Sequence, residues 1–292
     1  MLTRKEFHKL TSDGPLILDG ATGSNLMKAG MPRGCCTEEW ILANPEALVN
    51  LQRKYVEAGS QIIYAPTFQA QPIALQQVDL HKQTEAINAH LVALSKSVSQ
   101  DVLVAGNLTT LAAFTDSYAP ENFELLVENY RRQIHGLIDG GADLLAAETL
   151  MYPQEAEAIL TAAELEGASC CIYTFTMQSD GSLFSGMDAG PVLQDLVEAG
   201  AAAVGFNCVA ADMFTPGLVS KLRRYVRIPL VCKPNAGIPV IGEDALPHYP
   251  MAAEEYASIM LDCSKMGATV LGGCCGTDPS FIAALTNRLK NR

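Results

Sequence analysis

The sequence predicts an α/β protein that folds as a single (β/α)8 TIM barrel, with its site at the carboxyl ends of the strands. Eight short apolar runs alternate with helical segments along the 292 residues, and right-handed crossovers between parallel strands curl such a sheet until it closes. Hydrophobic residues are 49% and charged residues 18% of the chain, which suits strands that are buried on both faces. A doubly wound open sheet is the alternative fold.

The strands and helices are predicted from runs of apolar residues and from the prolines and glycines that border them. Helical segments begin at proline and end at glycine, which is the usual asymmetry of helix termini. The eight predicted strands cover residues 16–19, 61–65, 102–105, 144–147, 171–175, 203–206, 230–232 and 269–271. The clearest predicted helices cover residues 45–59, 153–167 and 191–200, and Pro120, Pro216 and Pro279 open others.

No linker, charge block or low-complexity stretch divides the chain, so residues 1–292 are predicted to form one domain. Two long irregular segments, residues 28–38 and 236–249, resemble insertions at the rim of a barrel. Because loops at this rim carry function in such folds, we expect both segments to cover the site.

Charge and composition narrow the choice of partners. The net charge of −12 comes from scattered acidic residues, so neither nucleic acid nor an anionic membrane is an expected partner. The first residues lack the apolar stretch of a signal peptide, and no run approaches the ~18 residues of a membrane span. Nine cysteines are an odd number, which favours a reducing compartment with metal-bound or core thiols. We therefore expect a cytoplasmic protein.

A repeat in the sequence places several polar residues at one level. Gly59, Gly141, Gly200 and Gly267 each end a helical pattern and precede an apolar run. The residues seven or eight positions after these glycines are Thr67, Glu148, Cys208, Cys274 and Cys275. In a parallel sheet, equal offsets bring these residues to the carboxyl-end rim, where barrels keep their chemistry.

Three of these rim residues, Cys208, Cys274 and Cys275, match an open zinc site. Catalytic zinc sites have three protein ligands and leave the fourth position to water or substrate. Adjacent residues of a regular strand point to opposite faces, but the glycines around Cys274 and Cys275 let the chain bend so that both reach one metal. The alternative is that each thiol is a small hydrophobic core residue.

The other cysteines have simpler interpretations. Cys170 and Cys171 open a strand and so belong to the opposite end of the barrel, while Cys232 and Cys263 fit strand and helix interiors. Core filling is expected for these four. Cys35 and Cys36 lie in the loop after the first strand, and no repeat offset places them.

Two carboxylates also end apolar strands, and such groups are costly to bury without a cation. Asp19 is either a cap or turn residue or a clamp on a substrate ammonium, and Glu148 shares the rim level of the cysteines. The stretch Gly20-Ala-Thr-Gly23 offers backbone amides to an anion. Past the seventh strand, Lys233 and Asn235 lie at rim level, and Asn235 is either a turn former or a neutral metal ligand.

The whole set of motifs resembles the homocysteine S-methyltransferase family over nearly the full chain. The segments that carry the resemblance are Leu18-Asp-Gly-Ala-Thr-Gly-Ser24, Tyr64-Ala-Pro-Thr-Phe68, Glu148, Gly205-Phe-Asn-Cys208, Lys233-Pro-Asn-Ala-Gly237 and Gly272-Gly-Cys-Cys-Gly276. The first-strand loop and the Tyr-Ala-Pro-Thr-Phe segment look closest to the homocysteine-binding module of cobalamin-dependent methionine synthase. Gln69 stands where the betaine enzymes have a tyrosine, which argues against betaine as a donor.

The resemblance implies a role for each motif residue. Cys208, Cys274 and Cys275 bind Zn2+ and serve catalysis, and Asn235 matches an asparagine implicated as the fourth ligand when substrate is absent. The substrate-binding residues follow in the same way: Asp19 and Glu148 hold the amino group of homocysteine, and the backbone amides of Ala21 and Thr22 take its carboxylate.

The implied activity is zinc-dependent methylation of homocysteine to methionine. Because a coordinated thiol is deprotonated, attack of the zinc-bound homocysteine thiolate on a methyl donor is the expected chemistry. The chain has no recognisable cobalamin motif and no dinucleotide fingerprint, so we expect a methylcorrinoid on a separate carrier protein to be the donor. The alternatives are direct transfer from S-methylmethionine or S-adenosylmethionine, and a non-catalytic barrel that binds thiols or zinc.

Overall fold

A closed barrel of eight parallel strands forms the centre of the computed structural model, which describes residues 1–242 and 247–291. The strands are hydrogen-bonded in the order β1 (Leu16–Ile17), β10 (Val270–Leu271), β7 (Leu230–Asn235), β6 (Ala203–Ala210), β5 (Cys171–Phe175), β4 (Leu144–Leu150), β3 (Leu103–Thr109) and β2 (Ile62–Tyr64). A parallel bridge between Leu18 and Ile62 joins the first strand to the last and closes the ring. The predicted barrel is therefore confirmed, and the alternative of an open sheet is wrong.

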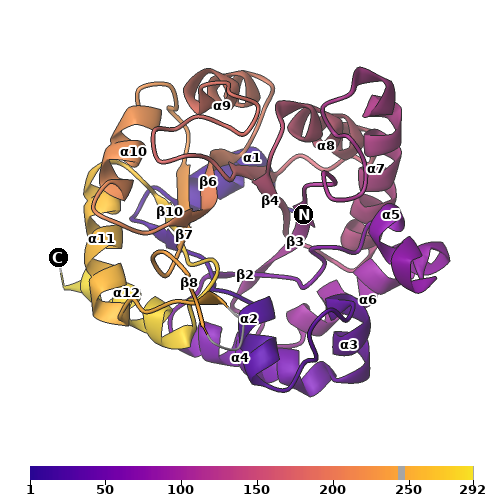
Figure 1. Ribbon diagram of the computed structural model, residues 1–292, viewed down its shortest axis with the longest axis horizontal. Helices are drawn as coiled ribbons and strands as arrows, with labels where there is room; N and C mark the ends of the chain where they lie inside the picture. Colours follow the sequence, from indigo (N-terminus) through magenta and orange to yellow (C-terminus); the bar gives the residue numbers. More distant parts are fainter. Residues whose placement is uncertain (243–246, 292) are drawn as a thin grey trace.

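The helices surround this barrel (Figure 1). The outer ring consists of α4 (Pro45–Glu57), α6 (Thr84–Lys96), α7 (Phe123–Asp139), α8 (Pro153–Leu165), α9 (Ala189–Glu198), α10 (Thr215–Leu222), α11 (Ala253–Lys265) and α12 (Pro279–Lys290). The short helices are α1 (Arg4–Leu10), α2 (Gly23–Lys28), α3 (Thr37–Ala43) and α5 (Pro72–Leu75), with 3-10 turns at Gln76–Val78, His81–Gln83 and Pro120–Asn122.

Glycine and proline mark many of the helix boundaries, as the sequence predicts. Gly59 and Gly167 come two residues after α4 and α8 and have φ values of 106° and 73°, a conformation that favours glycine. One predicted start is wrong: α9 begins at Ala189, before Pro191, because the side chain of Asp188 caps the Gly190 amide at 2.9 Å. An aspartate cap thus sets this helix start in place of the proline.

The strands are β1 (Leu16–Ile17), β2 (Ile62–Tyr64), β3 (Leu103–Thr109), β4 (Leu144–Leu150), β5 (Cys171–Phe175), β6 (Ala203–Ala210), β7 (Leu230–Asn235) and β10 (Val270–Leu271). Four of them run past their predicted ends by three or four residues, namely β3, β4, β6 and β7. The prediction stopped at the last apolar residue, whereas polar inward-facing side chains continue the ladder at the carboxyl ends. Those extensions build the site.

The amino-terminal end of the barrel is closed by α1. Phe7 is fully buried in the cluster of side chains that fills the barrel interior. The Leu2 amide donates to the Asp143 carbonyl at 2.6 Å, and a ring nitrogen of His8 lies 2.8 Å from the Ala202 carbonyl. Asp143 and Ala202 each immediately precede a strand, so the open end is the carboxyl one.

The buried cysteines follow the prediction. Cys170, Cys171, Cys232 and Cys263 are all 5% exposed or less, and Cys170 packs in the same interior cluster as Phe7. The prediction that these four cysteines fill the core is confirmed. Among the described residues, no helix is long and apolar enough to cross a lipid bilayer.

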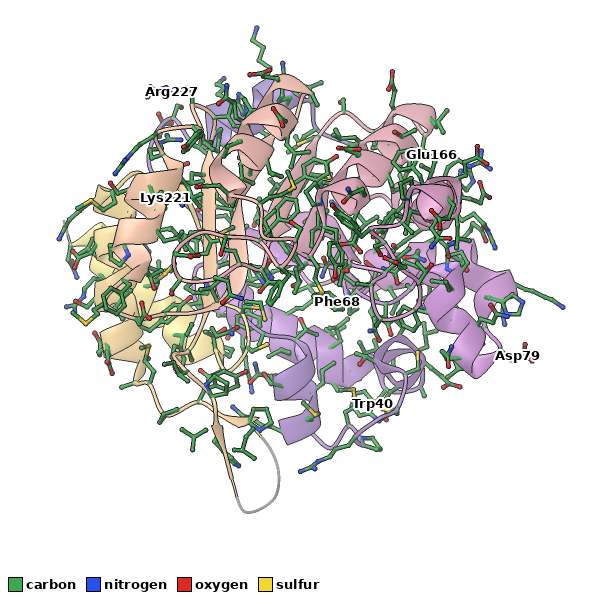
Figure 2. The ribbon with its side chains drawn as sticks, turned by 45° about the horizontal axis from the view of Figure 1, so that its top comes forward. Trp40, Phe68, Asp79, Glu166, Lys221 and Arg227 are labelled. Carbon is green, nitrogen blue, oxygen red and sulfur yellow. The ribbon has the colours of Figure 1, made fainter. Side chains whose placement is uncertain are left out.

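The two long rim segments differ in structure. Residues 28–38 end in the first turn of α3, where the buried Glu38 carboxylate accepts a hydrogen bond from the Gln69 amide at 2.7 Å. Residues 236–249 contain the antiparallel pair β8 (Val240–Ile241) and β9 (Pro247–His248), and positions 243–246 of this predicted insertion lie outside the described residues. Figure 2 shows Phe68, which follows β2, near the middle of the face, with Trp40 farther out on α3.

Candidate metal and substrate site

Cys208, Cys274 and Cys275 converge at the carboxyl end of the barrel. Cys208 lies in β6, and the other two follow β10. Their three sulfur atoms all lie within 4.8 Å of one another, and the sulfurs of Cys208 and Cys275 are 4.0 Å apart. The convergence that the sequence repeat predicted is therefore observed.

Local backbone distortions turn these thiols toward each other. Cys208 has a φ of 57° and lies in a bulge of the β6–β7 ladder between Asn207 and Ala210. A left-handed conformation at a residue other than glycine costs of order 1–3 kcal/mol and recurs at functional sites. Thr149 repeats the pattern, with a φ of 58° in a bulge of the β4–β5 ladder.

The glycines around the cysteine pair have two different roles. Gly276 has a φ of 81°, so it supplies the predicted bend. Gly272 and Gly273 have no positive φ but leave no room for a side chain: a Cβ atom would lie 2.6 Å from Leu18 Cβ at Gly272 and 2.4 Å from Thr277 Oγ1 at Gly273. The prediction that all three glycines are needed for bending is thus corrected, because two of them are needed for close packing.

The three sulfurs lie close enough together to hold one zinc ion. With Zn–S bonds of about 2.3 Å, tetrahedral geometry separates ligand sulfurs by about 3.8 Å, close to the separation of Cys208 and Cys275. Hydrogen bonds from Cys208 and Cys274 lower the pKa of the Cys275 thiol to about 3, while hydrogen bonds with Cys274 and Cys275 raise the pKa of Cys208. The cluster therefore favours a thiolate before any metal binds, and the donor set fits zinc with one open position.

Asn235 and Tyr249 border the sulfur cluster. The Asn235 side-chain oxygen accepts a hydrogen bond from the Cys275 amide at 3.0 Å, which orients the cysteine turn. The Tyr249 ring covers Gly276, and its hydroxyl donates to the Cys275 sulfur. The segment 236–249 thus reaches the site as expected. Tyr249 was assigned no role in the sequence analysis, since only the folded insertion brings it back to the cysteines.

Below the sulfurs lies a layer of polar side chains that point into the barrel, centred on Glu148. One Glu148 oxygen accepts from Asn107 at 2.9 Å, and the other lies 3.1 Å from the Lys233 ammonium. Asn207 contacts the second oxygen at 3.5 Å and the Cys274 sulfur at 3.8 Å. This layer, which we call the acidic floor (Asp19, Glu148 and Lys233 with the two asparagines), connects the two buried carboxylates to the sulfur cluster.

Asp19 is the second carboxylate of the acidic floor. It is 1% exposed, and one of its oxygens accepts a hydrogen bond from the Tyr64 amide at 2.8 Å. Burial raises the pKa of Asp19 to about 7, against the opposing effect of the Lys233 charge. Burial also raises the pKa of Glu148, again opposed by Lys233. In both carboxyl groups, therefore, burial opposes ionisation and the Lys233 charge favours it.

The amides predicted to take a carboxylate lie in the turn after Asp19. The Ala21 amide donates to the Thr277 hydroxyl at 3.2 Å, and the Ala21 carbonyl accepts from the Tyr55 hydroxyl at 2.8 Å. Ala21 is thus held from both sides, and a substrate carboxylate there competes with Thr277. Thr22 precedes α2, and its predicted role is compatible with that place.

Several residues around the floor were not assigned a role from sequence. Lys233, Asn107 and Asn207 continue the inward alternation of Val231, Ala105 and Ala203, so the period of two along a strand was the signal that could have found them. The remaining rim residues have bracing roles. The Thr67 hydroxyl donates to the Asn107 carbonyl at 2.8 Å. Cys35 and Cys36 pack against a separate apolar cluster that contains Leu26 and none of the three clustered thiols.

Comparison with known proteins finds related sequences over nearly the whole chain. The family model described as homocysteine S-methyltransferase matches residues 16–289. Homocysteine S-methyltransferase of Escherichia coli K12 is 28% identical over 301 residues, which cover 94% of both chains. Methionine synthase of Mycobacterium tuberculosis H37Rv is 25% identical over 295 residues, which cover 94% of this chain and 25% of that protein. The chain therefore spans about a quarter of the length of the methionine synthases that it matches.

The fold is also similar to that of solved structures. The metallated form of the homocysteine methyltransferase MmuM from Escherichia coli has a TM-score of 0.82 with this chain at 26% identity. The match covers 96% of this chain and 98% of MmuM. The oxidized form of MmuM has a TM-score of 0.80 at the same identity.

Proposed function

Because this chain belongs to the homocysteine S-methyltransferase family, we propose that it methylates homocysteine to methionine at a zinc ion held by Cys208, Cys274 and Cys275. The observation that carries the proposal is the meeting of three sulfurs within 4.8 Å directly above a buried acidic floor. Family membership favours an enzyme over the non-catalytic binding protein considered from the sequence. Formation of methionine by the purified, zinc-loaded protein tests it.

Each part of the site has a task in this reaction. A free aliphatic thiol is mostly protonated at neutral pH, and bound zinc supplies the missing step by lowering the pKa of a thiol ligand. The acidic floor holds the substrate ammonium, and the amides near Ala21 and Thr22 take its carboxylate. Asn235, the proposed fourth ligand in the absence of substrate, already orients the Cys275 turn.

In the proposed methyl transfer, one bond to the methyl carbon forms as another breaks. The thiol proton leaves to solvent, a new bond forms between the homocysteine sulfur and the methyl carbon, and the bond from that carbon to the donor breaks with its electron pair on the donor. The chain contributes by holding sulfur, methyl carbon and leaving group in line, which is a positioning effect worth several kcal/mol.

Glu148→Gln should weaken homocysteine binding by about tenfold or more while zinc content is retained. The reason is that the change removes one buried negative charge from the floor and leaves the charge of Lys233, 3.1 Å from that carboxylate, unbalanced near the substrate ammonium. A charge-assisted interaction is worth about 1.5–3 kcal/mol. Titration calorimetry and elemental analysis measure the two quantities. The matched control is Glu164→Gln on the exposed face of α8, and an unchanged affinity in Glu148→Gln would leave Glu148 a purely structural role.

Homocysteine affinity should rise by about tenfold between pH 6 and pH 8. The pKa of Asp19 is raised to about 7 by burial, so Asp19 is mostly neutral at pH 6 and mostly ionised at pH 8. The substrate ammonium stays mostly protonated in this range, because the carboxylate of the free amino acid raises the pKa of its amino group. Affinity is therefore lost as pH falls through 7. Binding measured across this range in the native protein and in Asp19→Asn, in which this rise should be absent, separates Asp19 from the titration of thiols.

We further propose that the methyl donor is a methylcorrinoid carried by a separate protein. The support is an apolar rim at the carboxyl end of the barrel, where loops after β6 and β7 expose large hydrophobic side chains. The members of this apolar rim are Met213, Phe214, Ile238, Val240 and Ile241, which are 57–82% exposed. Large exposed apolar side chains near a site are typical of protein interaction surfaces, and a small donor such as S-methylmethionine or S-adenosylmethionine has no need of them.

The free thiols bear on the cellular compartment in which the protein works. All nine cysteines are free, including the three of the cluster. We propose a cytoplasmic location, because a reducing compartment keeps such clustered thiols available for metal.

A further inference from the structure

A lysine ammonium is buried inside the acidic floor. Lys233 extends from β7 into the barrel and is 3% exposed. Its nitrogen lies 3.1 Å from one Glu148 oxygen and 4.9 Å from the centre of the Tyr64 ring. Burial by itself lowers the pKa of Lys233, but Glu148, Cys274 and Asp19 together raise it well above its ordinary value. The lysine therefore carries a full positive charge at the place where a substrate ammonium is expected.

The two carboxylates of the floor differ in how well they are satisfied. Both oxygens of Glu148 have partners, Asn107 on one side and Lys233 with Asn207 on the other. Asp19 has only the Tyr64 amide on one oxygen, and its other oxygen is buried without a hydrogen-bond partner in the described part of the chain. An unpaired buried acceptor is costly, so the unmet demand for a cation lies at Asp19.

Two ionised carboxylates and one ammonium leave the floor with one net negative charge. We propose that Lys233 is a specificity-determining residue: it neutralises Glu148 and leaves Asp19 as the single uncompensated charge that binds the substrate ammonium. This inference rests on the proposed function, since it concerns how the same pocket recognises homocysteine. It assigns Glu148 to the lysine and Asp19 to the substrate.

The assignment makes a specific prediction about charge. In Glu148→Gln the charge of Lys233 is no longer balanced by Glu148. The charges of Lys233 and Asp19 then cancel, and the lysine repels the substrate ammonium. If Glu148 acts only on Lys233, removing both partners restores one net negative charge and restores binding. If Glu148 itself holds the substrate, the double variant binds as poorly as Glu148→Gln. Such a cycle isolates the coupling between two residues in contact.

The experiment is titration calorimetry with homocysteine at pH 8 on the zinc-loaded full chain. The variants are Glu148→Gln, Asp19→Asn, Glu148→Gln with Lys233→Met, and Glu148→Gln with Lys233→Gln, in which the two amide side chains can bond each other. Lys54→Met on the exposed face of α4 is the control for loss of a lysine. Thermal unfolding and zinc content establish that each variant is folded and loaded.

The expected result is an affinity about tenfold weaker in Glu148→Gln and in Asp19→Asn, with at least one double variant within about threefold of the native protein. The same ligand without its ammonium, 4-mercaptobutanoate, should bind the native protein and Asp19→Asn alike. Double variants that are folded and zinc-loaded yet bind no better than Glu148→Gln would overturn the assignment. A native protein that binds no homocysteine would instead contradict the proposed function, so the two failures are distinguishable.

Discussion

Replacing Cys274 with alanine should lower the zinc content from about one ion per chain to nearly none and reduce homocysteine methylation by more than about a hundredfold. Two remaining thiols cannot hold zinc with an open coordination position, because three protein ligands are the usual minimum of a catalytic site. Even partners that only orient a ligand cost 10–100-fold in metal affinity when they are removed, so the loss of a ligand should cost more. Elemental analysis and a chelator competition measure the metal directly.

The matched control for Cys274→Ala is Cys35→Ala. Cys35 is a partly exposed thiol that packs beside Leu26, outside the sulfur cluster, so this change should leave zinc content and activity intact. Equal zinc in the native protein and in Cys274→Ala would remove Cys274 from the ligand set. A loss of zinc that also occurs in Cys35→Ala would point to a general effect of thiol removal.

The sequence was sufficient for the barrel and the sulfur cluster because both depend on a short local rule. A glycine follows α9 and another follows α11, each just before the next strand, so equal counts from Gly200 and Gly267 bring Cys208 and the Cys274 pair to one level. The strands between are short and buried on both faces, which leaves little freedom in register. The convergence of thiols therefore follows from counting, without knowledge of long-range contacts.

The acidic floor was harder to predict, because its charges are arranged by contacts between distant strands. Lys233 was placed at rim level, but its partner Glu148 lies 85 positions earlier in the chain. The bond between the Ala21 amide and Thr277 spans 256 positions. No local pattern shows which buried carboxylate is already neutralised, so both were assigned to the substrate from sequence.

The second large expected effect is the dependence of the reaction rate on the methyl donor. With a methylated corrinoid protein as the donor, the zinc-loaded chain should form methionine at least about tenfold faster than with S-methylmethionine, S-adenosylmethionine or betaine at equal concentration. A docked protein gains affinity from the apolar rim, in which a few buried large side chains supply most of the binding energy. Free methylcobalamin makes no such contact and should be a poorer donor than the carrier.

Two charged substitutions in the rim separate docking from chemistry. Phe214→Asp with Ile241→Asp should slow transfer from the carrier protein by about tenfold or more, because each aspartate places an unpaired charge in an apolar interface. The same variant should use free methylcobalamin at the native rate, since neither side chain belongs to the sulfur cluster or the acidic floor. Leu165→Asp, at an equally exposed leucine where α8 ends on the opposite side of the barrel, is the control and should change neither rate. Steady-state kcat/KM for each donor decides the question: if S-methylmethionine gives the highest value and methylcorrinoid gives none, the carrier is not the donor and the rim serves another purpose.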